Sequence, residues 1–163
     1  MADVMTAAQR SAFMSAIRPK GTKLELRVFA ALRQAGVRFR THVPVLPGCT
    51  PDIVLPKSMA VVLIHGDFWH GWRFPIWEPR LAPFWRRKIS VNRARDRRNC
   101  RALRRAGWRV LRVWEHDVER DLRAVVAKIA GVVSTTVSRK AAHRHEPRLR
   151  ATLRSFKSSS EAA

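Results

Sequence analysis

The spacing of apolar residues along the chain predicts three helices. Apolar side chains recur every three or four residues with polar residues between them, and we expect the helices to span about 22–36, 84–106 and 122–129. This period is typical of amphipathic helices. Thr22 and Glu25 have the spacing of a capping box, so we expect the first helix to begin there.

Shorter runs with a different pattern predict four strands. Residues 37–41 and 108–114 alternate between apolar and polar side chains, whereas 52–55 and 59–64 are nearly continuous apolar runs. Both patterns are typical of strands, half-buried in the first case and buried in the second. The segment 66–83 is interrupted by prolines, and we expect no regular structure in it.

The order of these elements is helix, three strands, helix, strand and helix, which predicts an α/β fold with a small mixed sheet flanked by helices. We expect one domain over 21–132, preceded by an arm (1–20) and followed by a basic tail (133–163) that is disordered because it lacks apolar periodicity. No apolar run approaches the roughly 20 residues that cross a bilayer, and the first residues lack the pattern of a secretory signal, so we expect a cytoplasmic protein.

The charge of the chain indicates a polyanionic partner. Thirty-three Lys and Arg against twelve Asp and Glu give a formal net charge of +21. A bias toward arginine from base composition is the simpler explanation, but the basic residues cluster: Asp96 is the single acid between Arg86 and Arg112. Because arginine binds phosphates and stacks on bases, this clustering favours nucleic acid.

The residues that carry chemistry lie around the two buried strands. Asp52 begins one strand and His65 ends the next, so pairing of these strands brings the two residues to one edge of the sheet. The Asp52 carboxylate and the main-chain carbonyl of Ile64 are oxygen donors of the kind that Mg²⁺ prefers. His70 is placed to deprotonate a water molecule, while His65 is placed to steady the phosphate or protonate the leaving oxygen. Glu25 would orient a metal-bound water. This interpretation predicts that the side chains of Asp52, His65 and His70 converge on one divalent cation at the edge of the sheet.

Taken one at a time, these residues are better explained as a Pro-Asp turn and two loop histidines. Their joint occurrence reverses that judgement and favours a nuclease site.

Several motifs resemble, in the same order, those of the very short patch repair (Vsr) endonucleases. The resemblance covers roughly residues 10–122 and implies the restriction-endonuclease-like fold. It also implies a Mg²⁺-dependent nick on the 5′ side of the thymine in a T:G mismatch, which arises when 5-methylcytosine deaminates. The motifs are Thr22-Lys-Leu-Glu25, Leu46-Pro-Gly, Pro51-Asp52-Ile-Val, His65-Gly-Asp-Phe-Trp-His70, Phe84-Trp85-Arg-Arg-Lys-Ile89, Asn92-Arg-Ala-Arg-Asp96-Arg and Gly107-Trp-Arg-Val-Leu-Arg-Val-Trp-Glu115.

The resemblance also implies a role for each matching residue. Asp52 would bind the metal, His70 would be the general base, His65 the second catalytic histidine and Glu25 the supporting acid. Aromatic residues would wedge into the base stack beside the mismatch, although plain core packing explains about half of the aromatic residues in this region. The expected DNA contacts are Phe68, Trp69, Trp85, Lys88, Asn92, Arg95 and Arg97, together with Arg10 and Met14 in the arm.

The chain departs from the family at the positions that hold a structural zinc in relatives. Asp67 and His116 stand at two of these positions, and the cysteines and histidines after His70 are missing. One remaining ligand does not make a zinc site, so we expect no structural zinc. Trp72, Phe74 and Trp77 would fill the space. Asp67 either forms a hydrogen bond within the loop or lends its carboxylate to the metal.

Two rival functions remain. The first is an endonuclease of the same fold with a different specificity, either a nickase or a restriction-type enzyme. The second is a non-catalytic, arginine-rich DNA-binding protein, which would bind duplex DNA without needing Asp52 or His70. The main interpretation predicts double-stranded DNA as the partner of a monomer, with repair proteins or a cytosine-5 methyltransferase system as functional partners.

Overall fold

The computed structural model describes residues 20–133, together with residues 6, 8, 9, 12 and 15. The expected DNA contacts Arg10 and Met14 lie outside the described residues, and so does the expected basic tail beyond residue 133.

A four-stranded mixed sheet forms the centre of the fold. Its strands are β1 (Arg40–Thr41), β2 (Ile53–Leu55), β3 (Ala60–His65) and β4 (Arg109–Trp114), and they lie side by side in that order. The pairs β1–β2 and β2–β3 are antiparallel, whereas β3 and β4 are parallel. The expected mixed sheet is therefore confirmed, and its single parallel pair is the one whose strands are connected through a long helix.

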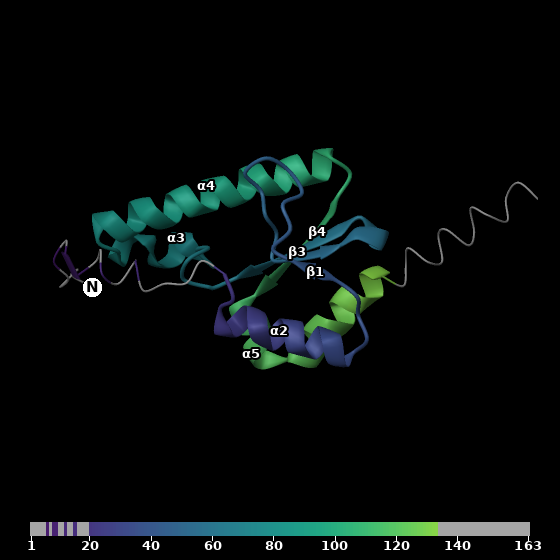
Figure 1. Ribbon diagram of the computed structural model, residues 1–163. Coiled ribbons are helices and arrows are strands. Elements are labelled where there is room, and N and C mark those ends of the chain that lie inside the picture. Colours follow the sequence, from purple (N-terminus) through teal and green to yellow (C-terminus); the bar gives the residue numbers. More distant parts are fainter. Residues whose placement is uncertain (1–5, 7, 10–11, 13–14, 16–19, 134–163) are drawn as a thin grey trace, which may run out of the picture.

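Helices cover both faces of this sheet. Figure 1 shows α4 (Pro83–Arg105) along one face and α2 (Lys23–Gln34) with α5 (Glu115–Arg120) against the other. Neighbouring residues of a strand point to opposite faces. Accordingly Ile53 packs in the larger core with α2, while Val54 packs in a smaller core beneath α4.

Helix α2 begins where the capping box predicted. The Thr22 hydroxyl accepts a hydrogen bond from the Glu25 backbone N–H, and Val28, Phe29 and Leu32 are buried against the sheet. This arrangement fixes the start of the helix and places Glu25 in its first turn, 5% exposed. The N-terminal end of α2 thus carries a carboxylate toward one end of the sheet.

Helix α4 matches the predicted second helix to within one residue at each end. Ile89, Cys100 and Leu103 face the sheet, and most of the other positions are polar or basic. Within the described part of the chain, no helix is both long and apolar enough to cross a membrane. Most of the arginine side chains of α4 are exposed.

The last predicted helix is present, and the helical residues 122–133 extend beyond the expected 129. The short helix α5, directly after β4, was not predicted because its six residues contain a single buried side chain, Val118.

The prediction of no regular structure over 66–83 was wrong. This segment contains α3 (Phe74–Trp77) and a 3₁₀ turn (Glu78–Arg80). Pro75 lies in the first turn of α3, where the fixed φ angle of proline suits a helix and its missing N–H costs nothing. Phe74, 2% exposed, anchors the turn in the core.

The first strand is shorter than expected, since only Arg40 and Thr41 of the range 37–41 pair with β2. Strand β2, with which it pairs, has three residues, so the ladder of hydrogen bonds between the two strands is short. A 3₁₀ turn, Pro56–Ser58, then links β2 to β3.

Candidate active site

A cleft of about 940 Å³ opens between the start of α2, the ends of β2 and β3, and the middle of α4. Most of the residues that the sequence singled out line this one cleft, although they come from positions far apart in the chain. These residues are Glu25, Asp52, Ile64, His65, Phe68, Trp69, His70, Lys88, Asn92 and Arg95.

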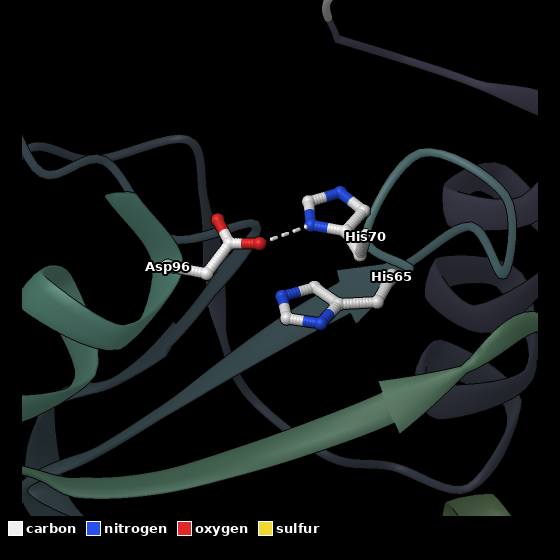
Figure 2. A group of neighbouring side chains, drawn as sticks. All are labelled: His65, His70 and Asp96. Carbon is white, nitrogen blue, oxygen red and sulfur yellow. Dashed lines mark hydrogen bonds and ion pairs between the residues drawn. The ribbon is translucent and has the colours of Figure 1, made fainter. Parts of the chain in front are cut away.

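His65 and His70 stack on each other inside the cleft. Their ring centroids are 3.9 Å apart and the rings are 3° from parallel. Figure 2 shows the two imidazoles one above the other, with the carboxylate of Asp96 from α4 beside His70. The distance from His70 Nδ1 to Asp96 Oδ2 is 2.6 Å. The sequence placed Asp96 in a motif but gave it no role.

Asp96 remains ionised beside His70. Burial raises the pKa of Asp96, but the hydrogen bond with His70 and the neighbouring positive groups outweigh burial and hold the pKa below its ordinary value. A carboxylate at Nδ1 favours the tautomer with the proton on that nitrogen. His70 Nε2 is then an acceptor, which is the form that a general base requires.

His65 is buried, with 3% of its surface exposed. Burial is the main cause that lowers its pKa to about 3, and the neighbouring His70 adds to the effect. The imidazole is therefore neutral near pH 7. Its Nδ1 has no hydrogen-bond partner among the described residues, and a buried polar atom without a partner costs about 1–3 kcal/mol. Such an unpaired atom in a cleft is typical of a site that binds a polar group.

Asp52 lies immediately before β2, and its Oδ2 accepts a hydrogen bond of 2.6 Å from the backbone N–H of Ile64. Burial raises the pKa of Asp52 to about 6; the hydrogen bond from Ile64 acts in the opposite direction, and the nearby Glu25 raises the pKa further. Because burial makes the ionised form of Asp52 unfavourable, a cation beside it would stabilise that form strongly.

Glu25 is held by three hydrogen-bonding groups. Its carboxylate accepts hydrogen bonds from the Gly21 N–H at 2.9 Å and the Thr22 hydroxyl at 3.0 Å, and His42 Nε2 lies 3.1 Å away. The sequence analysis missed His42. The register of the first hairpin would have pointed to it, because Thr41 pairs with Ile53 and the next residue along therefore lies beside Asp52.

The candidate metal-binding and proton-transfer residues form two groups rather than one. Possible ligand atoms of Glu25, His42 and Asp52 lie within 4.8 Å of one another, and the same is true of His65, His70 and Asp96. The sequence placed Asp52 and the two histidines around a single cation. The structure places them in one cleft but divides them between two neighbouring sets.

The three aromatic residues expected to enter the DNA contact one another. The ring centroid of Phe68 lies 5.0 Å from that of Trp69 and 6.0 Å from that of Trp85, and the two tryptophans are 5.9 Å apart. Phe68 and Trp69 line the cleft, and Phe68 is 41% exposed. By contrast, Phe74 is buried in the core, as expected for the aromatic residues of this region that serve packing.

The expected DNA contacts on α4 divide into two flanks. Lys88, Asn92 and Arg95 line the cleft at helical spacing. Arg97 is exposed but does not line it, because two residues correspond to a rotation of about 200° around the helix axis. The Asn92 side chain donates a hydrogen bond of 3.1 Å to the Trp69 carbonyl, so it joins α4 to the segment 65–70.

Asp67 does not line the cleft, and its carboxylate pairs with His116. His116 Nδ1 lies 2.8 and 3.0 Å from the two oxygens of the Asp67 carboxylate, and the Asp67 backbone N–H donates to Glu115 at 3.0 Å. We call Asp67, Glu115 and His116 the clasp. The expected hydrogen bond of Asp67 within the loop is replaced by one to His116 in α5. Among the described residues, neither group of possible metal ligands includes Asp67.

Of the three aromatic residues expected to fill the space of the missing zinc site, Trp72 contacts the clasp, and Trp77 and Phe74 follow behind it. The Trp72 ring lies 4.4 Å from that of His116, and the Trp77 indole donates a hydrogen bond of 2.7 Å to the Trp72 carbonyl. Phe74 and Trp77 meet edge to face at 5.1 Å. Whether the purified protein binds zinc stays a prediction.

Comparison with known proteins identifies the family. The family model described as DNA mismatch endonuclease Vsr matches residues 2–75. The type II nicking enzyme V.XorIIP of Xanthomonas oryzae pv. oryzae is 40% identical over 136 residues, which cover 82% of this chain and 98% of that enzyme. The DNA mismatch endonuclease Vsr of Escherichia coli K12 is 42% identical over 118 residues, which cover 71% of this chain and 74% of that enzyme.

A solved structure supports the fold. The catalytic domain of the homing endonuclease I-Bth0305I superposes with a TM-score of 0.50 at 22% sequence identity, over 72% of this chain and 99% of that domain. This likeness, together with the mixed sheet and its flanking helices, is consistent with the restriction-endonuclease-like fold. The sequence relatives, the fold and the cleft agree: the chain belongs to the Vsr family and is a DNA endonuclease.

Proposed function

We propose that this protein nicks double-stranded DNA on the 5′ side of the thymine in a T:G mismatch, in a Mg²⁺-dependent reaction that starts repair of deaminated 5-methylcytosine. The observation that carries the proposal is the cleft itself: the His70–Asp96 pair, the stacked His65 and the Asp52 carboxylate line one cavity. The names of the relatives, a mismatch endonuclease and a nicking enzyme, support the same reaction class.

The residues present fit a divalent cation. The buried Asp52 carboxylate, with its pKa raised to about 6, is stabilised by any positive charge placed beside it. Asp52 and the main-chain carbonyl of Ile64 would hold the ion, and both are the oxygen donors that Mg²⁺ prefers. When bound there, the cation supplies positive charge that offsets the charge developing on the phosphate.

His70 is the general base of the proposed reaction. The Asp96 carboxylate at Nδ1 leaves Nε2 to take the proton of the attacking water as its oxygen bonds to phosphorus and the bond to the leaving oxygen breaks. His65, neutral because its pKa is about 3, donates a hydrogen bond to the phosphate. Of the two roles expected for His65, this pKa favours steadying the phosphate over protonating the leaving oxygen.

The partly exposed aromatic cluster accounts for mismatch recognition. Phe68, Trp69 and Trp85 form one apolar wedge at the edge of the cleft, stiffened by their mutual contacts. Inserting side chains between bases costs a few kcal/mol per step, and the cost is least at a mismatched pair. The wedge therefore favours a mismatched duplex without reading the flanking sequence. Lys88 and Arg95 contact phosphates beside it.

The remaining parts of the proposal concern organisation and partners. Residues 21–132 form the endonuclease domain, preceded by an arm that contacts DNA through Arg10 and Met14 and followed by a basic tail. The protein acts in the cytoplasm as a monomer, and its functional partner is a cytosine-5 methyltransferase system that creates the deaminated base.

A nicking assay tests the function directly. Matched duplexes that carry T:G, U:G, T:C or no mismatch are incubated with the full chain and Mg²⁺, with EDTA as a control. We expect strand-specific nicking of T:G at the highest rate. Equal nicking of all duplexes would favour an endonuclease with another specificity. Binding without nicking would favour a non-catalytic DNA-binding protein.

A further inference from the structure

His42 contacts both of the acidic residues in the metal-binding half of the cleft. Its backbone N–H donates a hydrogen bond of 3.2 Å to the backbone carbonyl of Asp52. Its imidazole Nε2 lies 3.1 Å from the Glu25 carboxylate. A single residue therefore joins the segment directly before β2 to the first turn of α2.

The backbone of His42 is held in a conformation that few residues adopt. Its φ angle is +52°, in the left-handed region. Residues other than glycine adopt this region only at a cost in conformational free energy. The imidazole packs edge to face against Phe29, with ring centroids 5.9 Å apart. The ring and the backbone are thus both fixed, and together they hold the hydrogen bond to one acid and the contact with the other.

Glu25 needs such a partner because it is 5% exposed. A buried carboxylate is costly unless it is paired, and Gly21 and Thr22 supply only uncharged donors. Among the described residues, the ion-pair partner of Glu25 is His42. Burial is the largest cause of the raised pKa of Asp52, and of the side chains around it Glu25 raises that pKa while His42 lowers it. His42 therefore offsets the charge that Glu25 would otherwise impose on Asp52.

We propose that His42 is a positioning residue for the nicking reaction: it holds Glu25 and Asp52 in the arrangement in which Asp52 takes up a divalent cation. The inference rests on the proposed function, because it assumes that Asp52 is the metal ligand. In this proposal His42 is not itself a ligand, although its ligand atom lies within 4.8 Å of those of Glu25 and Asp52, because its Nε2 is engaged by the Glu25 carboxylate at 3.1 Å. Its effect passes through the two acids that it contacts.

Binding of Mn²⁺ to the full chain without DNA tests the proposal independently of catalysis, with free Mn²⁺ measured by electron paramagnetic resonance. His42→Phe keeps an aromatic ring against Phe29 but removes the contact with Glu25. Loss of a residue that orients a metal ligand typically weakens metal affinity about 10- to 100-fold, and we expect a loss in this range. His42→Asn, which tolerates the left-handed conformation and keeps a side-chain donor, should lose less. Nicking by His42→Phe should recover at high Mg²⁺ because the catalytic groups remain.

The clasp offers a matched control, since His116 also pairs with carboxylates outside the His65–His70–Asp96 group, those of Asp67 and, at 3.6 Å, Asp117. His116→Phe removes a contact of the same kind, 2.8 Å long, but away from the cleft. This variant should bind Mn²⁺ with the affinity of the parent protein. Parental affinity in a folded His42→Phe variant would overturn the proposal, and so would an equal loss in both variants.

Two further variants separate failure of the positioning role from failure of the proposed metal site. If His42→Phe does not fold, as judged by circular dichroism, His42→Gln decides, because unchanged Mn²⁺ affinity in that variant also overturns the proposal. Asp52→Asn tests the assumption beneath it: parental Mn²⁺ affinity in that variant would refute Asp52 as the ligand and with it the proposed metal site. A loss in Asp52→Asn combined with no loss in His42→Phe would refute only the positioning role.

Discussion

Two histidine–carboxylate pairs lie at opposite sides of the segment 65–70, and they differ in what surrounds them. His70 and Asp96 meet at 2.6 Å inside the cleft, beside the unpaired Nδ1 of His65. Asp67 and His116 meet at 2.8 Å in the clasp, where both side chains are 30% exposed. The two contacts have nearly the same geometry. One lies in a cavity with an unsatisfied polar atom, and the other joins two segments at the surface.

The comparison shows that the pairing itself does not define a catalytic group. A carboxylate orients an imidazole equally well in either place, but of the two rings only that of His70 lines the cleft. The hydrogen bonds of the clasp instead join the segment 65–70 to the residues directly after β4. The partially exposed pair should therefore contribute modestly to stability and little to the chemistry.

The largest expected effect on the nicking rate comes from a substitution in the cleft. Asp52→Ala should reduce nicking of a T:G duplex by about a thousandfold or more, because the site loses its metal-binding carboxylate. Affinity for the duplex should change little, since the basic and aromatic contacts remain. Nicking rates and a DNA-binding titration, each done with Mg²⁺, measure the two quantities. Retained cleavage would mean that another residue holds the metal.

Matched amide substitutions test the comparison itself. Asp96→Asn removes the charge that fixes the His70 tautomer and should slow nicking about a hundredfold, within the range that general base catalysis contributes. Asp67→Asn makes the same change in the clasp and should leave the rate within a few-fold of the parent. Single-turnover nicking rates decide. If both variants slow equally, the two pairs are not functionally different.

Asp52 should also destabilise the protein when no cation is bound. Its pKa is about 6 in the folded chain against an ordinary value of 3.8, so the folded state binds the proton more tightly than the unfolded state. Stability is therefore lost as pH rises from about 4 to about 6, and the loss amounts to at most about 3 kcal/mol above that range.

Asp52→Asn, which does not ionise, should therefore raise the free energy of unfolding at pH 7.5 in EDTA and have little effect near pH 3.5. Urea unfolding at the two pH values measures this difference. A destabilised variant at pH 7.5 would show that burial does not strain this carboxylate.

The aromatic wedge should control selectivity more than rate. Trp69→Ala removes one member of the three-ring cluster, and base–aromatic stacking is worth about 1–3 kcal/mol. We expect the preference for a T:G duplex over a fully paired duplex to fall about tenfold or more in a competition binding assay. Undiminished discrimination would remove the wedge from the proposal.

The smallest effect should come from the clasp. His116→Phe should lower the free energy of unfolding by about 1 kcal/mol or less, as is typical of a partly exposed ion pair, and should leave the nicking rate nearly unchanged. Thermal unfolding and the standard assay measure both. Elemental analysis of the parent protein belongs with this experiment, and we expect no stoichiometric zinc.

The sequence by itself determined the elements whose signals are local. The capping box at Thr22 and Glu25 placed the start of α2, and helical periodicity placed α4 to within one residue. Ordered motifs around Asp52 and His70 indicated the family, which the relatives confirm. In each case residues close together in the chain carried the signal, so no knowledge of the fold was needed.

Only the tertiary structure decided which side chains meet. The contact between His70 and Asp96 spans 26 residues and that between Asp67 and His116 spans 49. His42 reaches Glu25 from the position directly after β1, a strand whose pattern was recognised but whose register with β2 was not. These pairings depend on strand register and on how α4 crosses the sheet. Register and packing are set by contacts summed over the whole core, and no local pattern encodes them.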